Sequence, residues 1–406
     1  MTPIAAHNPV LSMLGRPLRL GVIGGGPGSF IGPIHRSAAE LDGRFRVVAG
    51  VLSSDPARSL AAGEALGLAR GRAYRSVSEM LAAETSRDDP LDAVAVMTPN
   101  DRHLDDCRHA LDAGLDLICD KPLANSVDDC LALQHAVEAS GRVFCLTHNY
   151  SGYPMVREAR AMVRAGRIGA VRLVHAEYLQ AGMAAAVEAL PLTPKLRWKL
   201  DVARSGPSLV MGDIGTHAHH LAAFVVASPV VAVAADIGAI VPARTVDDTA
   251  SMLWRFENGA RGSCCVSQAA AGAENDIRIR VYGETGMLEW RHAEPNTLLH
   301  APLGDALRVL RRGDPFLSAE ARRATRIARG HPEGFRESFA NLYADAAEAI
   351  VGRLTGRPVD RLALDFPTVR DGVDGMRFVA AALESSAREG SWVAIDQPPA
   401  GTSTTR

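Results

Sequence analysis

The sequence lacks the features that would direct it to nucleic acid or to a membrane. Its 44 Lys and Arg residues are balanced by 46 Asp and Glu residues, which leaves a formal net charge of −2. Without an excess of positive charge, neither nucleic acid nor an anionic membrane surface is an expected partner. The sequence has no run of about 18 uncharged apolar residues, so we expect no helix that spans a bilayer.

Cysteine is also scarce, and the N-terminal segment lacks the pattern of an exported protein. The six cysteines form no CxxC pair and show no paired spacing. Residues 1–20 lack the charged start, the apolar stretch and the small-residue cleavage site of a signal peptide. We therefore expect a cytoplasmic protein with reduced, mostly buried thiols at Cys107, Cys119, Cys130, Cys145, Cys264 and Cys265.

The first part of the chain alternates between short apolar runs and helical segments. Strands are predicted at residues 18–23, 46–52, 92–98, 115–119 and 143–147, and helices at 33–41, 56–66, 103–113 and 127–139. Strands that are apolar on both faces and alternate with helices indicate a parallel sheet with helices on each side. This α/β pattern predicts one domain over residues 18–149, preceded by an N-terminal arm at 1–17.

The pattern changes after Tyr150 and predicts a second domain over residues 150–396, as the chain length of 406 also favours. Its strands are predicted at residues 171–179, 230–240, 250–257, 262–268, 276–282 and 287–291, and its helices at 153–165, 217–226, 335–350 and 368–386. The pair Asn258-Gly259 is a hairpin turn signal, which favours a largely antiparallel sheet. The tail at 397–406 is rich in Pro, Gly, Ser and Thr, and is predicted to be disordered.

A glycine cluster follows the first strand and opens the first helix. At this place a dinucleotide pyrophosphate can approach the backbone and the free amides of a helix start. The match to GxGxxG is loose, because the third glycine position holds Ser29 and Gly32 comes later. A plain glycine-rich turn is the alternative. The predicted cofactor contacts are Gly24, Gly26, Pro27, Gly28, Ser29, Phe30 and Ile31.

The end of the second strand bears on the choice between NAD and NADP. NAD-binding folds usually place an acidic residue there, whereas NADP-binding folds supply a cation. Ser53 occupies the acid position, Ser54 follows it, and Arg58 lies at the start of the next helix. This arrangement favours NADP, although Asp55 is close enough to bind the ribose instead.

Three further motifs identify a family. Thr98-Pro99-Asn100 with His103 and Cys119-Asp120-Lys121-Pro122 each follow a strand, and Gly212-Asp213-Ile214-Gly215-Thr216-His217 lies in the second domain. With the glycine loop, they resemble the glucose–fructose oxidoreductase, inositol dehydrogenase and rhizopine catabolism family, called Gfo/Idh/MocA, from about residue 18 to 386. The resemblance implies a Rossmann domain that binds NAD(P) and an open-faced α/β domain. It adds Thr98, Pro99, Asn100, His103, Asp120 and Lys121 to the predicted cofactor contacts.

The resemblance also implies roles for the charged residues in the oxidation of a hydroxyl group on a sugar, inositol or related polyol. Lys121 would lie between nicotinamide and substrate, His217 would be the acid/base, and Asp213 would bind the substrate. An ammonium can stabilise a developing alkoxide, and an imidazole can take the hydroxyl proton. The chain departs from the family in two places: Asp120 stands where Glu is usual, and the glycine loop is longer.

Alternatives remain for several of these residues. Lys121 could be a surface lysine, and His217, His219 and His220 with Asp213 could bind zinc. We expect no metal, because the lysine motif explains the same residues, and we expect His219 and His220 to be packing or surface residues. Further candidates for substrate contact are Tyr150, Asn149 and Trp198, the last between Arg197 and Lys199, while Tyr178 is expected to be buried or at a subunit interface.

Other functions and partners are possible on the same scaffold. A redox-neutral, NAD-dependent glycosidase and a non-catalytic regulator that binds a dinucleotide are the alternatives to a dehydrogenase. We expect a homodimer or homotetramer joined through the sheet of the second domain. The arginine-rich segment 308–329 is interpreted as a solvated helix face or subunit contact, with an anion site as the alternative.

Overall fold

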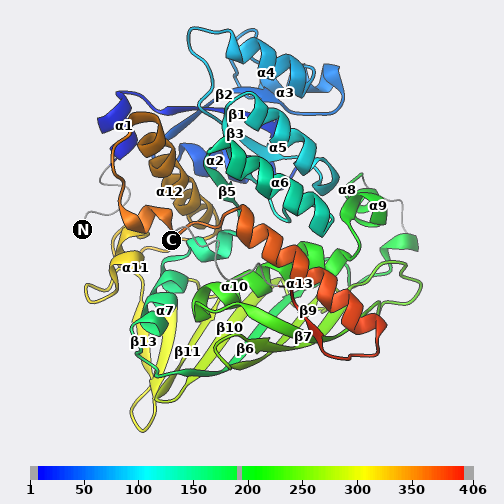
Figure 1. Ribbon diagram of the computed structural model, residues 1–406, viewed down its shortest axis with the longest axis vertical. Coiled ribbons are helices and arrows are strands. Elements are labelled where there is room, and N and C mark those ends of the chain that lie inside the picture. Colours follow the sequence, from blue (N-terminus) through cyan, green and yellow to red (C-terminus); the bar gives the residue numbers. More distant parts are fainter. Residues whose placement is uncertain (1–7, 190–193, 397–406) are drawn as a thin grey trace. The chain divides into compact units, whose positions relative to one another are not determined.

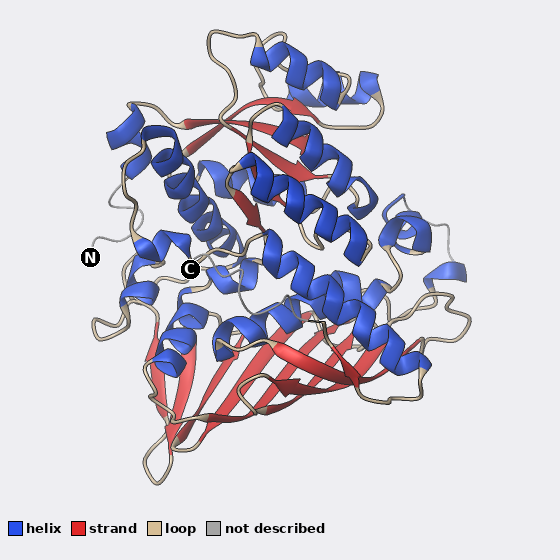
Figure 2. Ribbon diagram, in the orientation of Figure 1, coloured by secondary structure: helices blue, strands red, loops and turns tan. Residues whose placement is uncertain are grey.

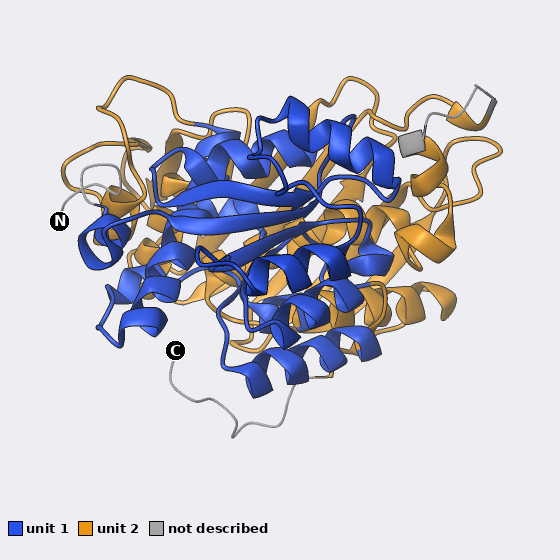
Figure 3. Cartoon of the chain, turned by 90° about the horizontal axis from the view of Figure 1, so that it is seen from above, with its two compact units in different colours: residues 1–124, 128–152, 334–373 blue, residues 125–127, 153–333, 374–406 orange. Residues whose placement is uncertain are grey.

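The computed structural model describes residues 8–189 and 194–396, so the predicted disordered tail lies outside the described residues. The chain forms two compact units (Figure 3). The first contains the described parts of residues 1–124, 128–152 and 334–373, and the second those of 125–127, 153–333 and 374–406. In the part of the chain that the structure describes, no helix is both long and apolar enough to cross a bilayer. All six cysteines are free thiols and five are buried, as predicted.

The first unit contains a five-stranded sheet whose neighbouring strands are all parallel (Figure 1). The strand order is β2 (Phe45–Val51), β1 (Leu18–Gly24), β3 (Ala93–Met97), β4 (Asp116–Cys119) and β5 (Phe144–Leu146). The associated helices are α1 (Pro9–Leu14), α2 (Ile31–Glu40), α3 (Pro56–Ala65), α4 (Val77–Thr85), α5 (His103–Asp112) and α6 (Val127–Ser140). The Rossmann architecture predicted from the alternating pattern is confirmed.

Helix α4 was not predicted, because its buried face contains a carboxylate. Glu84 is 1% exposed and binds the guanidinium of Arg72, which itself is buried. The Tyr74 hydroxyl donates to Glu84 Oε1 over 2.7 Å. A charged residue that is buried with its partner does not contribute to the apolar periodicity from which helices are predicted.

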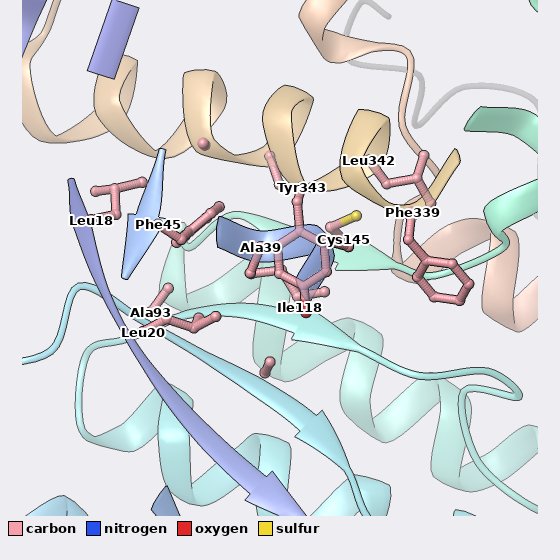
Figure 4. Close-up of a cluster of buried hydrophobic side chains, with 14 of the residues drawn as sticks. Leu18, Leu20, Ala39, Phe45, Ala93, Ile118, Cys145, Phe339, Leu342 and Tyr343 are labelled. Atoms are coloured by element: carbon pink, nitrogen blue, oxygen red, sulfur yellow. The ribbon is translucent and has the colours of Figure 1, made fainter. Parts of the chain in front are cut away.

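Helix α12 (Phe335–Thr355) belongs to the first unit, although its place in the sequence predicted that it belongs to the second domain. It packs against α2 and contributes Tyr343, Phe339 and Leu342 to a core that also contains Phe45 (Figure 4). Arg44 Nη1 lies 2.6 Å from Glu348 Oε1 in a buried ion pair. These contacts join residues about 300 positions apart, so a local pattern cannot indicate them.

The second unit contains a nine-stranded sheet that is antiparallel except for the parallel pair β6–β9. Figure 2 shows helices along one face of this sheet. The strand order is β13 (Arg308–Arg311), β12 (Thr297–Pro302), β11 (Gly286–Arg291), β10 (Asn275–Gly283), β6 (Val171–Gln180), β9 (Arg261–Ser267), β8 (Thr249–Phe256), β7 (Val230–Gly238) and β14 (Val393–Ala394). The other helices are α7 (Pro154–Arg164), α8 (Pro194–Lys199), α9 (Val202–Ser205), α10 (Thr216–Val226), α11 (Ala319–Arg323) and α13 (Val369–Ala387).

The arginine-rich segment, interpreted from its sequence as a solvated helix face or a subunit contact, is not one helix face. It begins as the strand β13 and later forms the short helix α11. Arg312 is buried, lies 2.7 Å from Glu333 Oε1, and donates to the carbonyl of Ile327 over 2.7 Å. Arg329 lies 2.9 Å from Asp314. At least these two arginines hold the segment together through charges and carbonyls of the second unit.

Candidate functional site

The glycine loop joins β1 to α2 and fits the close approach of a ligand to its backbone. A Cβ atom on Gly26 would lie 1.8 Å from the carbonyl oxygen of Leu52, so only glycine fits there. A Cβ atom on Gly32 would lie 1.9 Å from the carbonyl oxygen of Gly25. Gly32 therefore allows the close packing of loop and helix that the third glycine of GxGxxG provides, which explains why Ser29 can stand at the expected position.

Ser29 supports the loop instead of interrupting it. Its hydroxyl accepts a hydrogen bond from Gly32 N over 3.1 Å, and its own N–H donates to the Gly26 carbonyl over 3.0 Å. Phe30 is 66% exposed just before α2. A glycine-rich loop at the start of a helix fits the pyrophosphate of a dinucleotide.

At the end of β2, Asp55 caps the next helix. Its Oδ1 accepts the N–H of Arg58 over 2.8 Å, and Asp55 N donates to Ser53 Oγ over 3.1 Å. Ser54 and Arg58 are exposed. One oxygen of the carboxylate that could bind the ribose is therefore engaged in the cap of α3.

His103 connects the ends of two neighbouring strands. Its Nδ1 lies 2.9 Å from the carbonyl oxygen of Pro122, and its Nε2 lies 2.9 Å from that of Thr98. The Thr98 hydroxyl donates to Asp106 over 2.8 Å. Asn100 is buried in the turn that follows Pro99. His103 and Thr98, predicted as cofactor contacts, thus also tie the turn after β3 to the turn after β4.

The turn after β4 is held by the carboxylate of Asp120. Its Oδ1 accepts the N–H of Lys121 over 2.9 Å and the hydroxyl of Thr147 over 3.0 Å. The imidazole Nε2 of His35 lies 3.9 Å from the same oxygen, and His35 Nδ1 lies 2.8 Å from the hydroxyl of Tyr343. The peptide bond between Lys121 and Pro122 is cis.

These surroundings keep Asp120 ionised. Burial raises the pKa of Asp120, but the imidazole of His35 and the charge of Lys121 outweigh it and lower the pKa to about 2. The shorter side chain of Asp, where Glu is usual in the family, therefore still carries a negative charge beside Lys121. Lys121 itself is partly exposed directly after a parallel strand, where ligands of open α/β sheets bind.

In the second unit, Asp213 lies in a π-helical turn at Met211–Gly215, and α10 begins after it at Thr216. Asp213 and His217 thus lie on one continuous helical segment, with Asp213 in its π turn and His217 in the α-helix that follows. Its Oδ2 lies 2.5 Å from Lys199 Nζ and 2.7 Å from Gln268 Nε2. A single π turn within a helix is common at functional sites.

His217 is buried on the first turn of α10 with its ring 6.1 Å from that of Tyr178. Tyr178 is 4% exposed, as expected for a buried residue. His219 stacks on Phe378 at 4.3 Å and His220 on Phe224 at 5.8 Å, so both pack against aromatic rings. Among the residues that the structure describes, no group of three or more His, Cys, Asp or Glu side chains could hold a metal ion.

The remaining predicted substrate contacts differ in exposure. Tyr150 and Asn149 are buried in the first unit, where the Tyr150 ring lies 6.4 Å from Phe335. Asn149 Nδ2 lies 3.4 Å from Ser338 Oγ. Trp198 is partly exposed on α8. Gln268, which contacts Asp213, was not among the predicted site residues, and Lys199 was named only as a neighbour of Trp198, since no local pattern connects either residue to Asp213.

Comparisons with known proteins agree with this arrangement. Residues 18–148 match the family model described as oxidoreductase family, NAD-binding Rossmann fold, and residues 156–289 match the GFO/IDH/MocA C-terminal domain. An uncharacterized oxidoreductase of Bacillus subtilis, YfiI, is 31% identical over 94% of this chain and 98% of its own. A levoglucosan dehydrogenase of Pseudarthrobacter phenanthrenivorans is 29% identical over 69% of this chain and 75% of its own.

Similar solved structures include an inositol dehydrogenase homologue in two complexes. An inositol dehydrogenase homologue from Azotobacter vinelandii, complexed with NAD+, is 35% identical with a TM-score of 0.88, covering 93% of this chain and 97% of that chain. The same homologue complexed with NADH and myo-inositol has a TM-score of 0.86 at 35% identity, covering 93% and 98%. The chain therefore belongs to the Gfo/Idh/MocA family of NAD-binding oxidoreductases.

Proposed function

We propose that the protein transfers a hydride between NAD(P) and a secondary hydroxyl or keto carbon of a sugar, inositol or related polyol. The observation that carries the proposal is the turn after β4, where ionised Asp120 anchors the backbone of Lys121 in the unit with the glycine loop. The relatives named above support the substrate class, since one is a levoglucosan dehydrogenase and another was solved with NADH and myo-inositol.

The residues of the chain would divide the chemistry between them. The loop from Gly24 to Ile31 would hold the dinucleotide, whose nicotinamide accepts or returns a hydride when bound. Lys121 would donate a hydrogen bond to the reacting oxygen and stabilise its developing negative charge. His217 would take the hydroxyl proton during oxidation and return it during reduction, while Asp213 would accept a hydrogen bond from a neighbouring hydroxyl.

The test is a substrate screen with both cofactors. Myo-inositol, levoglucosan and D-xylose are offered with NAD and with NADP, and nicotinamide absorbance is followed. Oxidation of at least one polyol is expected. Hydrolysis of a glycoside without net change in absorbance would instead favour the redox-neutral glycosidase, and binding of the dinucleotide without any turnover would favour the regulator.

We expect NADP to be used better than NAD, because Arg58 is exposed at the start of α3 and Asp55 is engaged as its cap. Arg58→Ala should lower kcat/KM for NADP about tenfold, the value of one exposed charge-assisted hydrogen bond, and leave kcat/KM for NAD unchanged. Arg70→Ala, which removes another exposed arginine of the same unit, is the control. Better use of NAD by the wild-type protein would contradict this interpretation of the strand end.

We also propose a homodimer or homotetramer joined through the sheet of the second unit. One face of this sheet carries a row of side chains that are direct partners across the neighbouring strands β8, β9, β6 and β10. These residues are Leu253, Ser263, His175 and Arg280. Leu253 on this face is 54% exposed. Light scattering at micromolar concentration should give a multiple of the 43.1 kDa chain mass, and Leu253→Glu should lower it. A monomer mass for the wild-type protein would contradict the proposal.

A further inference from the structure

Two side chains from distant parts of the second unit hold one oxygen of Asp213. Lys199 Nζ and Gln268 Nε2 lie 2.5 Å and 2.7 Å from Oδ2. Lys199 is the last residue of α8, and Gln268 follows the end of β9. The Lys199 side chain is 16% exposed and that of Asp213 is 30% exposed, so the ion pair is partly shielded from water. Two donors on one oxygen restrict rotation of the carboxylate.

Gln268 is itself rigid. It is 1% exposed, its N–H donates to the Asp248 carbonyl over 2.8 Å, and its carbonyl accepts from Met183 N over 2.9 Å. Its Nε2 also lies 3.3 Å from Gln180 Oε1, and Gln180 Nε2 lies 2.7 Å from Asn275 Oδ1. The amide that contacts Asp213 is therefore tied to β6 and β10. The opposite orientation of the amide would turn an oxygen toward the carboxylate.

Lys199 contributes a positive charge, which the neutral side chain of Gln268 lacks. A carboxylate that is partly buried loses hydration, and a cation at hydrogen-bond distance compensates for that loss in the charged form. Lys199 has a partner of opposite charge in Asp213, so its geometry fits the support of this carboxylate. Neither Lys199 nor Gln268 belongs to the sequence motifs that identified the site.

We propose that Lys199, together with Gln268, is a positioning residue that holds the carboxylate of Asp213 oriented to accept a hydrogen bond from a substrate hydroxyl. This role rests on the proposed function in polyol oxidation. Loss of the lysine leaves Lys121 and His217 in place, so substrate binding suffers more than the chemical step. KM for the polyol then rises while kcat changes little.

The kinetic test compares Lys199→Met, Lys199→Arg, Asp213→Asn and the double variant Lys199→Met/Asp213→Asn. The substrate is whichever of myo-inositol, levoglucosan and D-xylose the wild-type protein oxidises. Lys199→Met raises KM roughly tenfold or more, the effect of one charge-assisted hydrogen bond, and Lys199→Arg restores it to within about threefold. In the Asp213→Asn background, Lys199→Met raises KM little further. Arg164→Met, which removes an exposed cation at the end of α7, leaves KM unchanged.

Equal effects of Lys199→Met in both backgrounds would overturn the proposal, because Lys199 would then act independently of Asp213. Failure of Lys199→Arg to restore KM would also overturn it. A merely structural lysine would lower the melting temperature without this dependence on Asp213.

Thermal unfolding of the same variants provides a measurement that needs no turnover. The fall in Tm of the double variant is smaller than the sum of the two single falls if Lys199 and Asp213 interact. A strictly additive fall would overturn the pairing. A wild-type protein that oxidises none of the polyols but shows this coupling would contradict the proposed function and leave the support of Asp213 by Lys199 standing.

Discussion

Lys121→Ala is expected to lower kcat by about 10² to 10³ while the protein still binds the dinucleotide, because the change removes a donor to the oxygen that becomes negative during oxidation. The glycine loop, which would hold the pyrophosphate, does not depend on the ammonium. Asp120 binds the backbone N–H of residue 121, so the turn keeps this anchor when the side chain is shortened. The measurements are steady-state kcat and cofactor affinity by fluorescence titration.

Arg108→Ala is the matched control for Lys121→Ala, since it removes an exposed cation from α5 in the same unit. It should change neither kcat nor affinity. A Lys121→Ala protein that retains kcat to within about threefold would exclude Lys121 from the reaction. A loss of cofactor affinity as large as the loss of kcat would indicate that Lys121 serves binding instead.

The fold could be predicted largely from the sequence because its strands are short, apolar and buried. All five residues of β3 are buried, and its predicted range of 92–98 exceeds the observed Ala93–Met97 by one residue at each end. The prediction failed where burial depends on charge pairs, as at Glu84 in α4 and Arg312 near β13. Periodicity detects apolar faces, and a buried ion pair removes that signal.

The site could be predicted only where it follows a strand or a continuous motif. Lys121 comes directly after a short apolar run, and the segment from Gly212 to His217 is a single motif. Lys199 and Gln268 are 14 and 55 positions from Asp213, so only the folded chain brings the three together. Gly32 shows the same limit, since its place against Gly25 becomes clear only from the path of the loop.

His217 as the proton acceptor and His217 as a zinc ligand predict different experimental results for the same protein preparation. His219 stacks on Phe378 and His220 on Phe224, which accounts for both neighbouring histidines by packing. A proton acceptor acts through one imidazole, whereas a zinc site requires three or four ligands from this group. Variants of the neighbouring histidines therefore separate acid/base catalysis from metal binding as clearly as variants of His217 itself.

His217→Asn is expected to lower kcat for alcohol oxidation by about 10² to 10⁴, the usual contribution of a general base. The wild-type rate should rise with pH as the imidazole loses its proton, and the variant should lose this dependence. His219→Phe, which keeps an aromatic ring against Phe378, should retain kcat to within about threefold. Both variants should still bind the dinucleotide, because the glycine loop belongs to the first unit. If the histidines held zinc, EDTA would abolish activity, zinc would restore it, and His219→Phe would be inactive as well.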